Sequence, residues 1–191
     1  MANLAVAQLR CAVGDVPTNL QKAKELIAEA SGQGRDVVCL PECFTTGLVY
    51  GRMEELAEPV PGPSSQVLCQ AAADGGLWVV AGMAEREGER LYNTALVISP
   101  QGEVVARYHK CFLYMQEADL FTRGSEPCVL DLGFITVGIT ICYDYVFPEY
   151  IRSLVMAGAR LLVHSTAWLD TEVCRTWRYP AVQAYRAQQM V

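Results

Sequence analysis

The sequence lacks the features by which several functional classes are identified. Its 191 residues hold 15 lysines and arginines against 21 aspartates and glutamates, a net charge of −6 at pH 7. This balance argues against a nucleic-acid-binding protein, which needs clustered positive charge. No apolar run reaches the roughly 18 residues that span a bilayer. The first residues, MANLAVAQLR, have neither the basic segment nor the cleavage site of a secretory signal. We therefore expect a cytoplasmic protein that binds neither nucleic acid nor membranes.

Metal-binding patterns are missing as well. The chain has only two histidines, and its eight cysteines, at positions 11, 39, 43, 69, 111, 128, 142 and 174, form no C-x-x-C pair. A structural zinc site is therefore not expected. In a reducing compartment most of these thiols should be small buried hydrophobic side chains.

The chain is rich in apolar segments of strand and helix type. Hydrophobic residues make up 52% of it, enough for one domain with a substantial core. Short apolar runs at 3–9, 36–40, 77–83 and 134–142 predict buried strands, and the two runs that flank SPQG, at 90–98 and 103–110, predict a hairpin. Helical spacing of apolar residues predicts helices over 17–34 and near 147–158. This alternation indicates a single α/β domain over residues 1–191.

Four polar or reactive side chains stand at or just beyond the ends of these apolar strands. They are Glu42, Lys110, Glu117 and Cys142. Because ligands of α/β sheets bind beyond the carboxyl ends of the strands, we expect these side chains to form one site. Taken singly, each also has an ordinary structural explanation, such as a helix cap, a solvated strand end or a buried thiol.

Cys142 is a candidate nucleophile. A thiol with a pKa of about 8.5 is mostly protonated at neutral pH, so nucleophilic attack by Cys142 needs a base or a positive field that favours the thiolate. The helix that begins near Pro148 offers a field, and Lys110 offers a full charge.

The base for this thiol is either a histidine or a carboxylate. His109 precedes Lys110 on a strand, so the two side chains point to opposite faces. His164 is interpreted as a core or loop histidine. Glu42 follows a buried strand and a proline, where desolvation makes a carboxylate a better proton acceptor, and it is the favoured base.

Three separated blocks then resemble the carbon–nitrogen hydrolase (nitrilase) superfamily. They are LPECFTTG, YHKCFLYMQE and GITICYDYVFPE, in the order that this superfamily has. The resemblance implies a four-layer α-β-β-α sandwich. It further implies that Glu42 is the general base, that Lys110 stabilises the tetrahedral oxyanion, that Cys142 is the nucleophile, and that Glu117 positions lysine and substrate.

The implied reaction is hydrolysis of a non-peptide amide bond through a thioester on Cys142, with release of ammonia or an amine. The backbone N–H of Tyr143 is expected in the oxyanion hole, and no metal or organic cofactor is needed. We expect the side chains of Tyr114, Tyr143, Tyr145 and Trp168 to contact the substrate.

The chain departs from the superfamily in two respects. Members normally continue well beyond a point like Val191, so we expect a domain that lacks its C-terminal part. Members often have a histidine two residues after the lysine, where this chain has Phe112. This change should alter the pocket wall and not the chemistry.

The residues after the cysteine bear on the substrate. Tyr143-Asp144 resembles many amidases and carbamoylases, and Tyr145 and Val146 stand where branches that bind a substrate carboxylate tend to have arginine. We therefore expect a neutral amide. An N-carbamoyl amide hydrolase, an ω-amidase that uses an arginine at 175 or 178, and a non-catalytic assembly module stay open as alternatives.

The resemblance also implies a homodimer or higher oligomer. We expect the contact to involve the helix 147–158, with Ile151, Leu154 and Val155, and the C-terminal segment with Trp177 and Tyr185.

Overall fold

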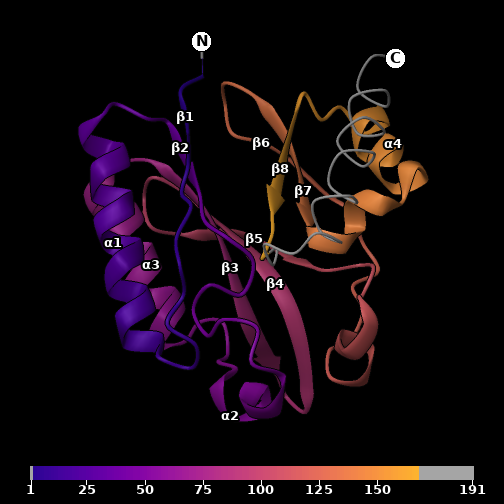
Figure 1. Ribbon diagram of the computed structural model, residues 1–191. Coiled ribbons are helices and arrows are strands. Elements are labelled where there is room, and N and C mark those ends of the chain that lie inside the picture. Colours follow the sequence, from indigo (N-terminus) through magenta and orange to yellow (C-terminus); the bar gives the residue numbers. More distant parts are fainter. Residues whose placement is uncertain (1, 168–191) are drawn as a thin grey trace.

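The structure, a computed structural model, describes residues 2–167 and contains two β-sheets (Figure 1). The larger sheet has the strand order β1-β2-β3-β4-β5, in which β1, β2 and β3 are parallel and β3, β4 and β5 form an antiparallel meander. Its strands are β1 (Leu4–Val6), β2 (Val37–Cys39), β3 (Trp78–Glu87), β4 (Arg90–Ile98) and β5 (Val104–His109).

The smaller sheet has three strands, with β7 between an antiparallel β6 and a parallel β8. They are β6 (Cys128–Asp131), β7 (Thr136–Ile141) and β8 (Leu161–Ser165). The α-helices are α1 (Val16–Gly32), α2 (Met53–Leu56), α3 (Pro63–Gly75) and α4 (Pro148–Met156). Three 3₁₀ turns cover Tyr50–Arg52, Met115–Asp119 and Cys142–Val146.

Local sequence explains where the two long helices begin and end. Asp15 caps α1 by accepting a hydrogen bond from the backbone N–H of Thr18 at 3.1 Å. Helix α3 begins with Pro63 at a position that needs no N–H donor, and it ends at Gly76, whose φ of 62° lies in the left-handed region.

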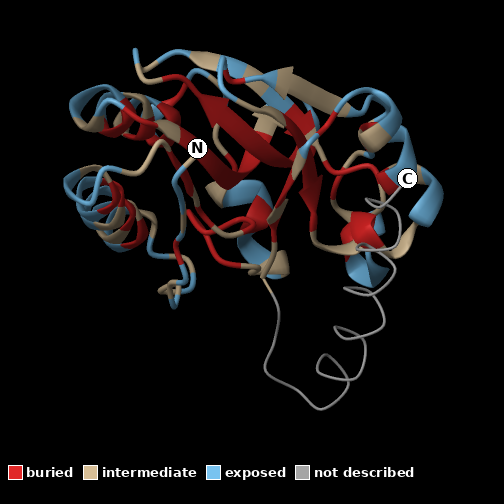
Figure 2. Ribbon diagram, turned by 90° about the horizontal axis from the view of Figure 1, so that it is seen from above, coloured by how far each residue is buried: buried red, intermediate tan, exposed pale blue. Residues whose placement is uncertain are grey.

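The elements form four layers. Helices α1 and α3 cover one face of the large sheet, the small sheet packs on its other face, and α4 lies beyond the small sheet (Figure 1). Alternate residues of β3 show this division, because Val79 packs in the core under the helices and Val80 packs between the sheets. Figure 2 shows buried residues along the strands and exposed ones on the outer sides of the helices. The predicted α-β-β-α sandwich is therefore confirmed.

Strand β3 is longer than the predicted run 77–83, because it continues through Glu85 to Glu87. Glu85 is fully buried and accepts hydrogen bonds from Thr94 at 2.8 Å and Arg107 at 2.7 Å. These partners on β4 and β5 compensate the buried charge, so a strand continues where its own sequence turns polar.

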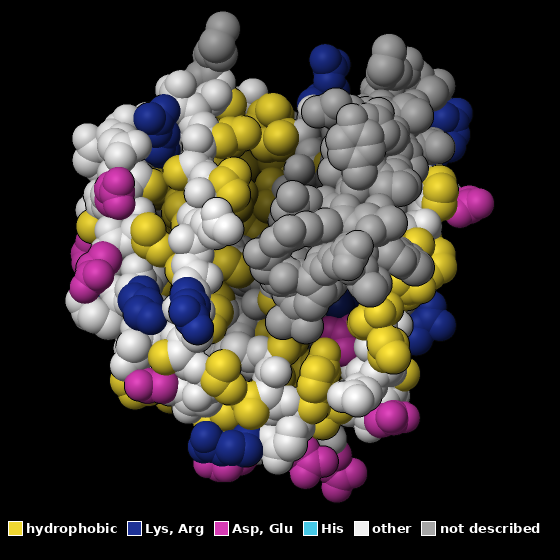
Figure 3. All heavy atoms as spheres, in the orientation of Figure 1, with side chains coloured by type: hydrophobic (Ala, Val, Ile, Leu, Met, Phe, Trp, Pro, Cys, Tyr) yellow, Lys and Arg dark blue, Asp and Glu magenta, His cyan; other side chains and the backbone are white. Residues whose placement is uncertain are grey.

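Strand β1 forms one edge of the large sheet and carries exposed apolar side chains. Val6 is 84% exposed, and Leu4 is 38% exposed. Figure 3 shows hydrophobic side chains gathered on this face of the molecule. Within residues 2–167, no helix combines the length and the apolar character needed to cross a membrane.

Candidate active site

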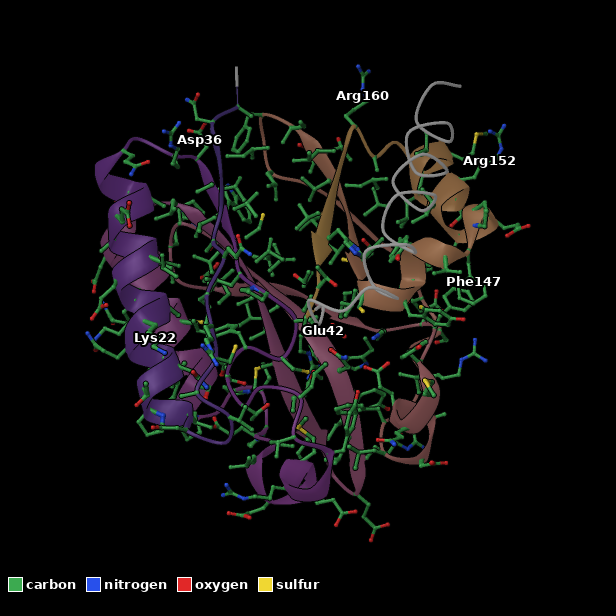
Figure 4. The ribbon with its side chains drawn as sticks, viewed as in Figure 1. Lys22, Asp36, Glu42, Phe147, Arg152 and Arg160 are labelled. Carbon is green, nitrogen blue, oxygen red and sulfur yellow. The ribbon has the colours of Figure 1, made fainter. Side chains whose placement is uncertain are left out.

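Glu42 lies at the centre of the molecule, where the two sheets meet (Figure 4). It follows β2 in a loop that runs along β3, with Leu40 N donating to Val80 O at 2.8 Å and Phe44 N donating to Gly82 O at 3.1 Å. A Cβ atom at position 82 would come within 2.7 Å of the Glu42 Cα atom, so this close approach requires glycine. The carboxylate that results is almost fully buried.

Lys110 is the only buried lysine of the described chain, and its ammonium group contacts two carboxylates. It follows β5, and its Nζ atom donates to Glu42 Oε1 at 2.7 Å and to Glu117 Oε1 and Oε2 at 2.9 and 2.8 Å. All three side chains are about 1% exposed. Three of the four predicted residues therefore form one buried ion cluster, in which each interaction is stronger than it would be in water.

Two backbone groups hold the carboxylates from outside this cluster. Glu117 lies in the 3₁₀ turn Met115–Asp119 and accepts from Tyr114 N at 2.7 Å. Glu42 Oε2 accepts from Ala167 N, just after β8, at 2.9 Å. The site thus joins segments from both sheets.

Cys142 stands directly after β7 and begins the 3₁₀ turn Cys142–Val146. Its φ of 43° lies in the left-handed region, which is uncommon for a residue with a side chain and is associated with functional sites. The turn is fixed by Asp144, whose Oδ2 atom accepts from Ile141 N at 2.8 Å and whose Oδ1 atom accepts from Phe112 N at 2.9 Å. Asp144 therefore connects the loop of the thiol to the loop that follows Lys110.

The charges of the cluster act on this thiol. Burial and the negative charge of Glu42 raise the pKa of Cys142, and the charge of Lys110 opposes them only in part. Burial also disfavours the Lys110 ammonium, but the charges of Glu42, Cys142 and Glu117 outweigh it and raise the pKa of the lysine. The resting site therefore contains a protonated thiol and a charged lysine, so attack requires transfer of the thiol proton to a base.

Both histidines make contacts with other side chains. His109 points away from Lys110, as the strand alternation predicted, and contacts Glu85 at 2.9 Å and the Tyr92 ring at 3.9 Å. His164 Nδ1 lies 2.9 Å from Thr140 Oγ1, and burial lowers the pKa of His164 to about 4.

The predicted substrate-contacting tyrosines fall into two groups. The ring centroids of Tyr114 and Tyr143 lie 4.9 Å apart, and Tyr114 is 44% exposed. Tyr145 is buried on the α4 side of the 3₁₀ turn, where its ring meets His164 edge-on at 5.1 Å. The structure thus brings Tyr114 and Tyr143 together and places Tyr145 apart from them. Trp168 lies outside the described residues.

Phe112 belongs to an aromatic wall next to the site. Its ring stacks on Phe147 at 3.7 Å and meets Tyr150 edge-on at 5.6 Å. Phe147 in turn contacts Tyr143 at 5.5 Å. The residue that departs from the superfamily pattern is therefore part of the wall on which Tyr143 packs.

Asn93, in the middle of β4, is a site residue that the sequence interpretation missed. Its Nδ2 atom donates to Glu42 Oε1 at 2.8 Å and to Glu117 Oε1 at 3.1 Å. The available signal is a single polar residue at an inward-facing position of the apolar run LYNTALVI.

The described chain offers no evident metal site. Within residues 2–167, no group of three or more histidine, cysteine, aspartate or glutamate side chains is arranged to hold an ion. The seven cysteines of this part of the chain are all free thiols.

Comparison with known families gives a match over almost the whole chain. The sequence pattern of the carbon-nitrogen hydrolase family matches residues 3–190. A nitrilase of Pyrococcus abyssi is 39% identical over 169 residues, which cover 86% of this chain and 64% of that protein. The omega-amidase NIT2 of Danio rerio is 35% identical over 185 residues, which cover 91% of this chain and 66% of that protein. The chain thus spans about two thirds of the length of these relatives.

Solved structures of an amidase from Nesterenkonia sp. have the same fold. One superposes with a TM-score of 0.90 at 28% identity, covering 100% of this chain and 73% of the amidase. A mutant of that amidase, with a TM-score of 0.84 and 29% identity over 91% of this chain and 70% of its own, shows acrylamide added to the active-site cysteine. Another mutant, with a TM-score of 0.90 and 27% identity over 100% of this chain and 74% of its own, holds butyramide.

Proposed function

The chain belongs to the carbon-nitrogen hydrolase family, and on this basis we propose that it hydrolyses a small neutral amide through a thioester on Cys142. The observation that carries the proposal is the buried cluster of Lys110 with Glu42 and Glu117, whose charges act on the strained cysteine. The amidases and omega-amidases among its relatives support the same class of reaction.

In the proposed acylation, Glu42 takes the thiol proton as the sulfur of Cys142 attacks the amide carbon. A C–S bond forms, and the carbonyl π electrons move to the oxygen. The Lys110 ammonium and the Tyr143 N–H donate to this oxyanion, and removal of one such preorganised donor costs roughly 3–4 kcal/mol of transition-state stabilisation. Collapse of the intermediate breaks the C–N bond, and Glu42 gives its proton to the leaving nitrogen.

In the proposed deacylation, water attacks the thioester while Glu42 removes a proton from it. The C–S bond breaks, the carboxylic acid leaves, and the proton returns to the sulfur of Cys142. Glu117 holds Lys110 by two oxygen atoms at 2.8 and 2.9 Å, so we assign it the role of fixing the oxyanion donor.

A second candidate is an ω-amidase, because several omega-amidases, among them that of Danio rerio, match at 30–35% identity. A substrate carboxylate would enter a site where two carboxylates already face one ammonium, and an unbalanced like-charge contact costs several kcal/mol. Its counter-charge would come from Arg175 or Arg178, which lie outside the described residues.

The test is ammonia release from butyramide, its ω-carboxylate analogue, an N-carbamoyl amino acid and a nitrile. We expect neutral amides to be preferred, Cys142→Ala to abolish turnover without unfolding the protein, and Cys69→Ala and Cys128→Ala to stay within about threefold of the wild type. A preference of about tenfold or more for the carboxylate analogue, lost in Arg175→Ala or Arg178→Ala, would identify an ω-amidase instead. Absence of turnover with every compound would favour the non-catalytic module.

We also propose that the protein forms at least a homodimer through α4 and works in the cytoplasm. Ile151 and Leu154 pack inside the protomer, so the contact would use the outer side of α4, where Met156 is 72% exposed. Trp177 and Tyr185 lie outside the described residues. Light scattering that gives a monomer mass at micromolar concentration would contradict the dimer.

A further inference from the structure

We propose that Asn93 is a positioning residue that holds Glu42 and Glu117 around Lys110, and that the Cys43 thiol fixes the orientation of its amide. The inference rests on the proposed function in assigning Glu42 the role of base. Asn93 adds a neutral donor to the charged side chains of the site.

The position of Asn93 allows it to contact every charged member of the cluster. It lies on β4 opposite Ala84 of β3, and it is 0% exposed. Its backbone carbonyl accepts from Lys110 N at 2.9 Å, which fixes the start of the lysine side chain. Its two amide hydrogens go one to Glu42 and one to Glu117. One residue therefore sets both the lysine backbone and the separation of the two carboxylates.

The charge of the cluster explains why an amide is suited to this place. Two buried carboxylates share one ammonium, which leaves an excess of negative charge inside the protein. Two N–H donors compensate part of this excess, because each favours an ionised carboxylate. A second lysine or arginine would neutralise the carboxylates more completely and make Glu42 a poorer proton acceptor. An uncharged side chain orders the carboxylates and leaves Glu42 able to accept a proton.

The amide has a defined orientation. Cys43 Sγ donates to Asn93 Oδ1 at 3.4 Å, so the oxygen faces the thiol and the nitrogen faces the carboxylates. Burial and the charge of Glu42 raise the pKa of Cys43 well above its usual range, so the thiol keeps the proton that it donates. A flipped amide would place its oxygen against Glu42 and Glu117 and leave the nitrogen facing a thiol.

Titratable side chains from several elements act on this arrangement. They come from the loop after β1, the loop after β2, the 3₁₀ turn Tyr50–Arg52, the end of β5, the 3₁₀ turn Met115–Asp119, the loop after β7, and strand β8. These side chains are Cys11, Glu42, Cys43, Tyr50, Lys110, Glu117, Cys142 and His164.

The experiment compares Asn93→Leu with Thr94→Val. The two residues are neighbours on β4, both are 0% exposed, and each donates to a buried carboxylate. Thr94 donates to Glu85 on the opposite face of the sheet, so Thr94→Val removes a buried hydrogen bond without touching the site. Each variant is assayed for kcat and KM of butyramide hydrolysis and for alkylation of Cys142 by iodoacetamide, followed by peptide mass spectrometry.

For Asn93→Leu we expect kcat to fall about 100-fold, because a displaced base no longer meets the thiol in the reactive geometry. We expect KM to stay within about twofold, since Asn93 does not touch the substrate. Alkylation of Cys142 should slow by about tenfold or more. Thr94→Val should match the wild type in all three readouts, namely kcat, KM and the alkylation rate.

A second pair of variants keeps the proposal testable if Asn93→Leu does not fold. Cys43→Ala removes the donor to the amide oxygen and should lower kcat and the alkylation rate in the same direction. Cys43→Ser keeps a donor and should restore both toward the wild type. Equal behaviour of Asn93→Leu and Thr94→Val, or of Cys43→Ala and Cys43→Ser, would overturn the proposal. A wild type that releases no ammonia but loses Cys142 reactivity on Asn93→Leu would refute the proposed function and uphold the positioning role.

Discussion

Replacement of Lys110 by methionine tests the charge balance of the site. Methionine fills similar space without a charge, so Lys110→Met leaves the carboxylates of Glu42 and Glu117 buried with no cation. The lost contacts measure 2.7 and 2.8 Å, and all three side chains are about 1% exposed. Removal of one partner of a buried ion pair costs about 3–5 kcal/mol, because the remaining charge stays uncompensated.

The assay is urea unfolding at pH 7. We expect Lys110→Met to lose about 3–5 kcal/mol of unfolding free energy, because the two buried carboxylates keep no counter-charge. The matched control is Lys22→Met, because Lys22 donates only to Arg10 O at the surface, at 3.1 Å, and its loss should cost less than about 1 kcal/mol. Activity should fall at least about 100-fold through loss of the oxyanion donor. Unfolding free energies of Lys110→Met and Lys22→Met within about 1 kcal/mol of each other at pH 7 would refute the reasoning.

Two further predictions concern the surroundings of the site. Gly82→Ala places a Cβ atom 2.7 Å from the Glu42 Cα atom, so we expect the unfolding free energy in urea to fall by about 1–3 kcal/mol and kcat to fall by about tenfold or more. In the control Gly32→Ala the new Cβ atom meets nothing within 4 Å, so kcat should stay unchanged. Equal kcat in the two variants would contradict this account. His164 is kept neutral by burial, which lowers its pKa to about 4, so the unfolded chain binds the proton more tightly. Unfolding free energy should therefore decrease by up to about 3 kcal/mol as the pH falls from about 6.5 to about 4. This part of the pH dependence should disappear in His164→Gln, and an unchanged pH profile of stability would show that His164 does not cause it.

The sequence predicted the site where a polar side chain interrupts the end of an apolar run. Glu42, Lys110 and Cys142 each stand at or just beyond the end of a predicted strand, and strand ends of an α/β fold converge, so their proximity could be expected from the sequence. The hairpin of β4 and β5 was also predicted, because SPQG separates two runs of strand type.

Features that depend on distant partners could not be predicted in this way. The end of β3 has a polar sequence, which does not predict a strand. Glu85 is buried in a strand there because residues of β4 and β5 stabilise its carboxylate, and the local sequence pattern does not contain these partners. The role of Asn93 arises from contacts with Glu42 and Glu117, 51 and 24 residues away. Helical spacing predicted that Ile151 lies on an apolar face of its helix. The spacing could not distinguish a residue that packs on its own sheet from one at a dimer contact.

The central claim is that Cys142 carries the acyl group during turnover. The direct measurement is rapid acid quenching of the enzyme with butyramide in the steady state, followed by mass spectrometry of its peptides. The account predicts a butyryl thioester on Cys142 that disappears as the substrate is consumed, with the other seven cysteines unmodified. Continued ammonia release by Cys142→Ala, or a butyryl group on a different cysteine during turnover, would contradict it.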